Sequence, residues 1–226
     1  MSSIHTLSRP FAILMGLLFS FGLWQIGEGS WIYAKARLAQ LLLQRAWNRA
    51  LAGEVAPKPW PWADTWPVAR LIVPGQHVDL IVLEGAYGRT LAFGPASVES
   101  GAQPGTQGTA IITGHRDTHF AFLKHVESGE RIGLQSADGH FHLYRVTDSR
   151  IVDSRRAVIP LTRSESALVL VTCYPFQTPI PGGPLRYVVT ADLERIGEKR
   201  GQEHKAESRT SGWPSSQFSI SMAAPD

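Results

Sequence analysis

The N-terminal part of the chain has a long apolar run that is typical of a membrane-inserted helix. Residues 11–26 (FAILMGLLFSFGLWQI) are mostly apolar and follow Arg9. As a helix they reach about 24 Å, and continuation to Ile32 reaches the roughly 30 Å of a bilayer core. We therefore predict that residues 1–33 form a membrane anchor or an export signal. Ala34-Lys35-Ala36 has the small-x-small form of a cleavage site, so both alternatives stay open.

Apolar positions at helical spacing continue over residues 31–51, and residues 34–67 are predicted to be a juxtamembrane helix followed by a linker. Such a helix either rests on anionic lipid or serves as a charged stalk. Its positive charges favour the cytoplasmic side, which conflicts with the external location inferred below. The linker, residues 53–67, holds four prolines and three tryptophans and is typical of a stiff spacer or a wrap around the next domain. The helix has no acidic residue and four basic ones, Lys35, Arg37, Arg45 and Arg49.

From residue 69 onward the pattern changes to short β-type runs separated by Gly, Pro and Asp. Eight such runs predict a mainly β domain over residues 68–193, either a barrel or a sandwich. The helix expected inside it lies around residues 119–126. Residues 194–226 are polar and aperiodic, and we expect them to be disordered. The predicted strands are residues 69–73, 78–84, 109–113, 131–135, 140–146, 150–152, 167–172 and 186–192.

Composition narrows the class of protein. A chain of 226 residues with 43% hydrophobic residues has material for one packed domain with appendages, which excludes a mostly disordered chain and a polytopic membrane protein. The net charge of +3 comes without a dense Lys/Arg patch, so we expect no nucleic-acid partner. Cys173 is the single cysteine, which excludes an internal disulfide and a Cys-rich zinc site.

Cys173 follows the most apolar predicted strand (ALVLVT), where the chain leaves the β domain. A buried small hydrophobe is the plain interpretation of such a residue. Against it, a lone thiol in an exported chain risks oxidation, and this one lies at a strand end. A cysteine nucleophile needs a proton-accepting or positive neighbour. His115 is the candidate, because it also follows a strand, in Thr113-Gly114-His115-Arg116-Asp117.

Arg186 begins the last predicted strand, in the run RYVVTAD. A guanidinium stays charged at any relevant pH, and its planar fork suits a peptide carbonyl or a developing oxyanion. Taken alone, Arg186 is better interpreted as an ordinary arginine that faces water at a strand edge.

Three motifs together resemble the sortases, cysteine transpeptidases with a His–Cys–Arg site on an eight-stranded β-barrel. They are ITGHRD at residues 112–117 (with Phe120, Leu123 and Gly129-Glu130 after it), LVTCYP at 170–175, and Arg186-Tyr-Val-Val. The family's Thr-Leu-x-Thr-Cys motif appears here with Val169 in place of its first threonine, a position expected to face the core. The resemblance covers roughly residues 69–192. The run LAFGPASVESGAQPGTQGTAIITGHRD at 91–117 looks most like class GN, the sortases of Gram-negative bacteria.

The resemblance implies the roles of the site residues. Cys173 attacks a peptide carbonyl of a sorting signal and forms a thioacyl-enzyme. His115 is general acid to the leaving amine and general base to the incoming one, Arg186 stabilises the oxyanion, and Thr172 touches the substrate. The implied partners are an exported protein with an LPxTG-like C-terminal signal and an amine acceptor that the sequence does not identify. The implied location is the inner membrane, with a single-pass anchor and the barrel facing the periplasm.

Other interpretations carry less weight. His115 and His119 have the spacing of two zinc ligands on a helix, but no Glu stands in the HExxH position. No acidic cluster favours calcium, so we expect no metal and no cofactor. The loop at residues 174–185 is either a substrate-contacting lid or a passive connection. Two competing functions stay open, a cysteine endopeptidase that passes the acyl group to water and a non-catalytic, anchored binding module.

Overall fold

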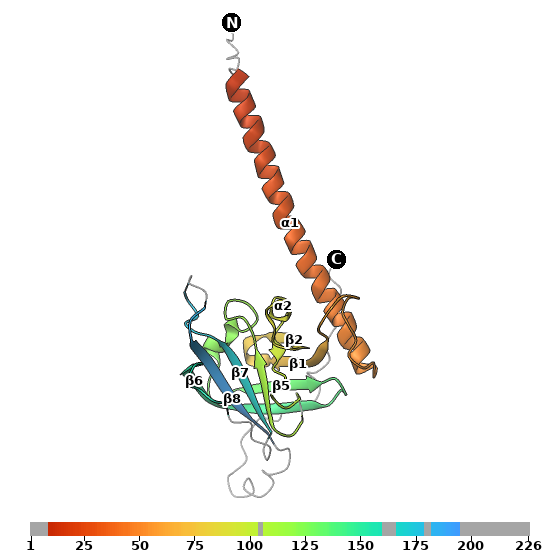
Figure 1. Cartoon of the computed structure of the whole chain (residues 1–226), viewed down its shortest axis with the longest axis vertical. Coiled ribbons are helices and arrows are strands. Elements are labelled where there is room, and N and C mark those ends of the chain that lie inside the picture. The colour runs from red at the N-terminus through yellow and green to blue at the C-terminus, as the bar shows by residue number, and fades with distance from the viewer. Residues whose placement is uncertain (1–8, 104–105, 160–165, 179–181, 195–226) are drawn as a thin grey trace, which may run out of the picture. The chain divides into compact units, whose positions relative to one another are not determined.

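The computed structural model describes residues 9–103, 106–159, 166–178 and 182–194. Within these ranges the chain forms one long helix and a closed barrel of eight strands (Figure 1). The mainly β class and the barrel are confirmed. The expectation of a disordered tail at 194–226 falls almost wholly on residues outside the described ones. The elements are α1 (Arg9–Leu51), β1 (Pro67–Val73), η1 (Pro74–Gln76), β2 (Val78–Glu84), α2 (Gly88–Leu91), β3 (Ala96–Ser97), β4 (Thr109–Thr113), η2 (Ala121–His125), β5 (Arg131–Ser136), β6 (Phe141–Asp153), β7 (Ala167–Cys173) and β8 (Leu185–Leu193).

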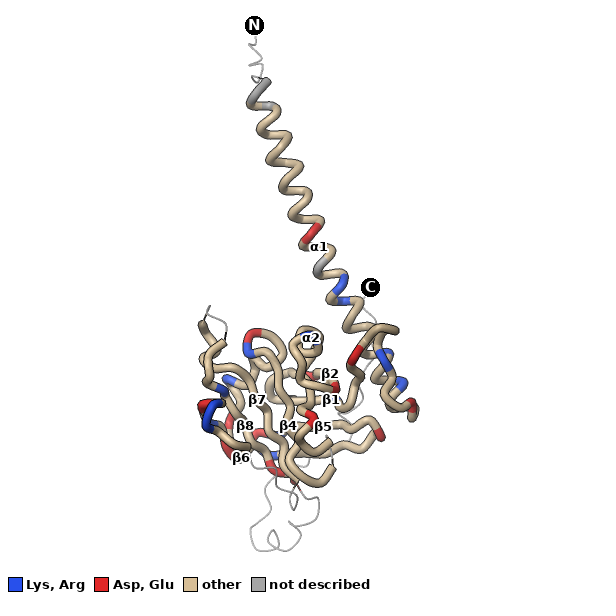
Figure 2. The backbone as a smooth tube through the Cα atoms, viewed as in Figure 1, with Lys and Arg blue, Asp and Glu red and all other residues tan. Residues whose placement is uncertain are grey.

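α1 is one continuous helix where the sequence indicated an apolar segment and a separate amphipathic helix. Large side chains along its N-terminal half are exposed, and that half carries no charged residue between Arg9, where the helix begins, and Glu28 (Figure 2). In the described part of the chain, however, no helix combines the length and the apolar character needed to cross a bilayer. The predicted transmembrane segment is therefore not confirmed.

The C-terminal half of α1 is part of the folded domain. Leu43 is 1% exposed and packs with Leu83 of β2 and Ala96 of β3. The side chain of Gln40 donates a 2.9 Å hydrogen bond to the carbonyl of Phe93. Trp47 is fully buried. This part of the helix lies against the barrel and is not a free stalk.

The segment rich in proline and tryptophan wraps onto the barrel, which was one of its two predicted alternatives. The ring of Trp60 packs edge-on against Phe93 at a centroid distance of 4.9 Å. The hydroxyl of Thr65 donates a 2.6 Å hydrogen bond to the carbonyl of Glu84. This segment therefore joins α1 to β1 through contacts with β2 and the residues that follow it.

The barrel closes in the order β1-β2-β3-β4-β7-β8-β6-β5. The observed elements differ from the predicted ones in two strands and one helix. β3, two residues long, was missed, because it is too short to show a period. Residues 140–146 and 150–152 belong to one strand, β6, which passes a register shift between Val146 and Asp148 and pairs with β8 on both sides of it. The expected helix at 119–126 is the short 3-10 helix η2.

Alternation along β7 separates two apolar clusters. Leu168 and Leu170 join the cluster that draws residues from strands all around the barrel and so fills its interior. Val169 and Val171 face the other way, in a smaller cluster with Ile111 of β4 and Val188 of β8, which we call the outer apolar cluster. Val169 is buried, as expected for the position of the lost threonine, but in this outer cluster and not in the interior. By the same alternation Cys173 lies on the outer face.

Candidate active site

The three predicted catalytic residues come from neighbouring strands at one rim of the barrel. β4 and β7 are parallel, so their C-terminal ends meet at the same edge, and β8 begins at that edge because it is antiparallel to β7. Figure 1 shows β7 and β8 side by side. Cys173 and Arg186 are directly paired residues in the last register position of β7 and β8. Directly opposed residues project on the same face of a sheet, with Cβ atoms about 5 Å apart.

His115 is held beside Cys173 by the residue that precedes it. The backbone N–H of Gly114 donates a 3.2 Å hydrogen bond to the carbonyl of Val171, which continues the β4–β7 pairing past the end of β4. The hydroxyl of Thr172 donates a 2.7 Å hydrogen bond to the carbonyl of Gly114. Because these contacts join the residue before His115 to the two residues before Cys173, strand pairing brings the imidazole and the thiol to one rim.

Gly114 is required by close packing. A Cβ at this position would lie 2.9 Å from the ring of Phe120, which is itself fully buried. The N–H of Phe120 in turn donates a 2.9 Å hydrogen bond to the carbonyl of His115, so the turn after β4 closes on itself. The imidazole of His115 is exposed, and the thiol residue Cys173 is half-buried. The plain interpretation of Cys173 as a buried core residue is therefore wrong, because the thiol lies on the outer face at the end of β7.

Arg186 is anchored to its own loop. Its Nη1 atom donates hydrogen bonds to the carbonyls of Gly183, at 2.7 Å, and Leu185, at 2.9 Å. These two bonds orient a half-buried guanidinium next to Cys173. Among the described contacts no hydrogen bond joins Cys173 to His115 or to Arg186, so the geometry of the three residues comes from the backbone.

Thr172 has a different position from the one the resemblance implied. Its side chain is 1% exposed, and its hydroxyl is engaged with Gly114. In this structure Thr172 supports the position of His115 from below the rim. A direct contact with substrate stays a prediction.

Arg116 is a residue of the site that the sequence analysis treated only as part of a motif. Its side chain is 6% exposed, an unusual burial for a guanidinium. Its Nη2 atom donates a 3.1 Å hydrogen bond to the carbonyl of Thr178, and its Nε atom lies 3.5 Å from Asp117. Arg116 thus ties the turn that carries His115 to the connection that follows Cys173. The position of Arg116 directly after the predicted catalytic histidine was the feature of the sequence that could have identified it as a residue of the site.

His119 lies next to His115 at the rim. Burial lowers its pKa below the usual 6.5, and the nearby His115 adds to this effect. The imidazole of His119 is therefore neutral at pH 7. Within the described part of the chain no group of three His, Cys, Asp or Glu side chains is arranged to hold a metal ion.

Comparisons with known proteins define the class. The family model described as "Sortase domain" matches residues 71–194, more than half of the chain. The chain belongs to the sortase family. Over 120 residues it is 30% identical to Sortase D of Bacillus subtilis (strain 168), a match that covers 53% of this chain and 60% of that protein. The matched region is thus less than two thirds of this relative's length.

Solved structures show the same fold. A Clostridium perfringens Sortase D5 transpeptidase superimposes with a TM-score of 0.51 at 21% identity, over 57% of this chain and 80% of that chain. Sortase A from Corynebacterium diphtheriae superimposes with a TM-score of 0.53 at 20% identity, over 71% of this chain and 86% of that one. At these identities the likeness establishes the barrel and not the reaction.

Proposed function

We propose that the chain is a membrane-anchored cysteine transpeptidase that joins exported proteins to an amine. The observation that carries the proposal is the pairing of Cys173 with Arg186 at the end of β7 and β8, with His115 held at the same rim by Gly114. A nucleophile, a general acid–base and a fixed positive charge are the groups that acyl transfer through a thioester requires. Membership of the sortase family supports this chemistry.

The reaction proceeds in two acyl transfers. The thiolate of Cys173 attacks the carbonyl carbon of a peptide bond, the C–N bond breaks, and His115 gives a proton to the leaving amine. An incoming amine then attacks the thioester carbonyl and gives a proton to His115. The C–S bond breaks, and the thiolate of Cys173 is released as the new amide forms. Arg186 stabilises the negative charge on the carbonyl oxygen in both steps, through N–H groups other than those that bind its own loop.

The position of the outer apolar cluster is an argument for a peptide substrate. Its side chains lie on β4, β7 and β8, on the face that also carries Cys173 and Arg186. A peptide in contact with this face places an apolar side chain against Val171, which is partly exposed, and its scissile carbonyl at the thiol. The proposed substrate is an LPxTG-like C-terminal signal of an exported protein, because signals of that type are what the sortase resemblance implies.

We place the enzyme at the inner membrane with its barrel in the periplasm. The support is the exposed apolar surface on the N-terminal half of α1, which includes Phe11, Leu17, Phe19 and Ile26. Exposed apolar surface of this extent marks contact with lipid or protein. Assignment to class GN is part of the same proposal and rests on the sequence at residues 91–117.

The proposal is tested with the full chain in detergent micelles, an LPxTG-type peptide and an amine such as diglycine. We expect a covalent acyl-enzyme on Cys173 by mass spectrometry, followed by a ligated product. Cys173→Ala and His115→Ala should abolish ligation. Arg186→Ala should lower kcat/KM by about 10²–10³, the usual cost of losing one oxyanion donor. Arg150→Ala, which removes an exposed arginine from the neighbouring strand β6, is the matched control and should be close to wild type.

The competing functions give different products in the same assay. A cysteine endopeptidase would form the acyl-enzyme and release it to water at a rate that the amine leaves unchanged. A binding module would retain the peptide without acylating Cys173. Either result would overturn the transpeptidase proposal. Carbonate extraction of membranes from cells that express the full chain or residues 34–226 tests the anchor separately, and only the full chain should resist extraction.

A further inference from the structure

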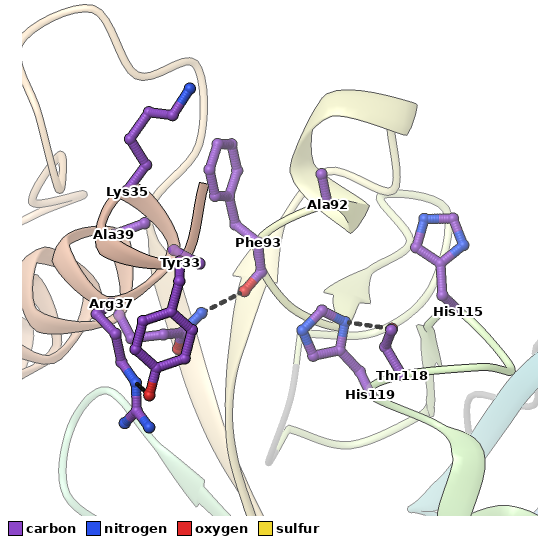
Figure 3. A pocket seen from close by; sticks show the side chains of 11 residues that line it. Tyr33, Lys35, Arg37, Ala39, Ala92, Phe93, His115, Thr118 and His119 are labelled. Atoms are coloured by element: carbon purple, nitrogen blue, oxygen red, sulfur yellow. Dashed lines mark hydrogen bonds between the residues drawn. The ribbon is translucent and has the colours of Figure 1, made fainter. Parts of the chain in front are cut away.

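A cleft of about 590 Å³ lies between the middle of α1 and the rim of the barrel (Figure 3). Tyr33, Lys35 and Arg37 form its helix side. His115, Thr118 and His119 line the opposite side, and Figure 3 shows Ala92 and Phe93 between the two. The volume is within the roughly 300–1,000 Å³ range of small-ligand sites. The proposed general acid–base therefore forms part of the wall of a cavity that Cys173 and Arg186 do not line.

The strand order places this cleft and the thiol on opposite flanks of His115. α1 packs on β1 and β2, and Phe93 leads into β3, which pairs with one edge of β4. β7, which carries Cys173, pairs with the other edge of β4. An acyl group on Cys173 thus meets His115 from one flank, and a molecule in the cleft meets it from the other.

The cleft has a positive lining. Lys35 and Arg37 contribute two cations, and no acidic residue is among the residues that line it. Both cations rest on aromatic rings of α1. The Lys35 ammonium lies 5.4 Å from the centre of the Trp31 ring, and the Arg37 guanidinium lies 4.9 Å from that of Tyr33.

Neither Lys35 nor Arg37 is paired with a carboxylate in the described part of the chain. Arg37 Nε donates a 2.8 Å hydrogen bond to the Tyr33 hydroxyl. Among the ion pairs of the described residues none involves Lys35 or Arg37. Cations that rest on aromatic rings and lack a carboxylate partner are available to an anionic ligand. The ends of the Lys35 and Arg37 side chains point in opposite directions (Figure 3), so each would meet an anion separately.

The chemistry of His115 indicates what enters the cleft. In acyl transfer the same imidazole protonates the leaving amine and deprotonates the incoming one, so the first amine departs and the second approaches the thioester on the His115 side. The neutral imidazole of His119 adds no charge that would repel an ammonium group. A cavity with a general base on one wall and two cations on the other suits a molecule with an amine at one end and an anion at the other.

We propose that this cleft is the acceptor site and that Lys35 and Arg37 select amines that carry a carboxylate or phosphate. This rests on the proposed transpeptidase function and adds the chemical class of its second substrate. The amine nitrogen attacks the thioester carbonyl carbon on Cys173 and forms the amide bond. The C–S bond breaks, the amine proton passes to His115, and the thiolate of Cys173 is protonated in turn.

The test compares acceptors that differ only in the anion. The full chain is first acylated with an LPxTG-type peptide, and the acyl-enzyme on Cys173 is measured by mass spectrometry. The rate of ligation is then compared for diglycine and diglycine amide, and for O-phosphoethanolamine and ethanolamine. We expect the anionic member of at least one pair to react about tenfold faster at limiting acceptor concentration. The acceptor pair that shows the rate difference identifies the preferred anion as a carboxylate or a phosphate.

The variants Lys35→Gln and Arg37→Gln, singly and together, assign the preference to the cleft. The ratio of the two rates within one variant is independent of the amount of folded enzyme and of its acylation rate. We expect the ratio to fall to about one in the double variant. Arg45→Gln removes a cation from an exposed position of the same helix outside the cleft and should retain the ratio.

Three outcomes would overturn the proposal. Wild-type enzyme that acylates but ligates both members of each pair at equal rates has no anion selection. A preference for the anionic acceptor that persists in the double variant is caused by residues other than Lys35 and Arg37. Binding to phosphatidylglycerol vesicles that depends on Lys35 and Arg37, with unchanged acceptor ratios, would assign these cations to a lipid surface. Absence of an acyl-enzyme would instead contradict the transpeptidase function itself, so the two failures are distinguishable.

Discussion

The hydroxyl of Thr172 donates a 2.7 Å hydrogen bond to the carbonyl of Gly114, across 58 positions of sequence. Thr172 precedes the proposed nucleophile and Gly114 precedes the proposed general base. The bond is buried, and it makes the relative position of the two functional residues a property of the folded core. The buried contact therefore sets the relative position of the two reacting side chains, because each belongs to a residue adjacent to it.

Thr172→Val removes this hydroxyl and keeps the shape of the side chain. The carbonyl of Gly114 then lacks the Thr172 donor inside the protein, so we expect a loss of about 1–3 kcal/mol in the free energy of unfolding. We also expect slower acylation of Cys173, because His115 loses a constraint. Thr172→Ser retains the hydroxyl, so its losses in the free energy of unfolding and in the acylation rate should be much smaller. Urea unfolding and acyl-enzyme formation are the measurements, and equal behaviour of the two variants would contradict the role of the hydrogen bond.

Gly114→Ala tests the close approach of this residue to Phe120. The new methyl group meets the buried ring at 2.9 Å, and overpacking of this kind costs about 1–3 kcal/mol. Thermal unfolding should show the loss, and Phe120→Leu in the same chain should recover part of it by making room. Gly88→Ala, where nothing lies within 4 Å of the added atom, is the control and should be neutral or slightly stabilising. No recovery in the double variant would argue against the steric explanation.

Arg116→Gln tests the link between the turn of His115 and the connection after Cys173. The shorter amide loses the contact with the carbonyl of Thr178, so we expect faster hydrogen exchange in the described residues 174–178 and a lower kcat/KM. Arg116→Lys should recover part of the activity, because a cation remains although the planar fork is lost. Arg155→Gln, at an exposed position, should leave both measurements unchanged. Unchanged hydrogen exchange in Arg116→Gln would show that the link does not order this connection.

The lowered pKa of His119 predicts that the free energy of unfolding depends on pH. Its folded-state pKa is below 6.5, mainly because of burial, so the unfolded chain takes up the proton first as the pH falls. The contribution to stability is therefore complete above pH 6.5 and is lost as the pH drops toward the folded-state pKa. Urea midpoints between pH 7.5 and 5 should fall more steeply for wild type than for His119→Gln. His125→Gln, at an exposed position of η2, should keep the wild-type slope.

Leu43→Ala tests whether α1 is an integral part of the fold. Leu43 is 1% exposed against Leu83 and Ala96, so its truncation should cost about 2–5 kcal/mol of stability. Leu41→Ala, at a position that is 62% exposed on the same helix, should change little. Chemical denaturation in detergent measures both. Similar small effects would mean that α1 does not pack on the barrel in solution.

Strand positions were predictable wherever apolar and β-branched residues form a short run bounded by turn residues, as in β2, β4 and β7. Strand β6 was predicted as two strands because Thr147, Asp148 and Ser149 are typical turn residues. In the fold Asp148 and Ser149 pair with β8 beyond a register shift at Thr147, and the pairing partner decides that the strand continues. The two-residue β3 lacks any local signal, because its conformation comes from pairing with β2 and β4.

The sequence by itself determined the mainly β class and the sortase resemblance, and it predicted His115, Cys173 and Arg186 as the catalytic residues, because these depend on local periodicity and short motifs. Tertiary structure alone decided that Cys173 faces outward, that Thr172 is buried under His115, and that Arg116 joins two loops. It also formed the cleft between α1 and the rim. The physical reason is that each of these features depends on contacts between residues tens of positions apart, and such contacts exist only once the strands have paired.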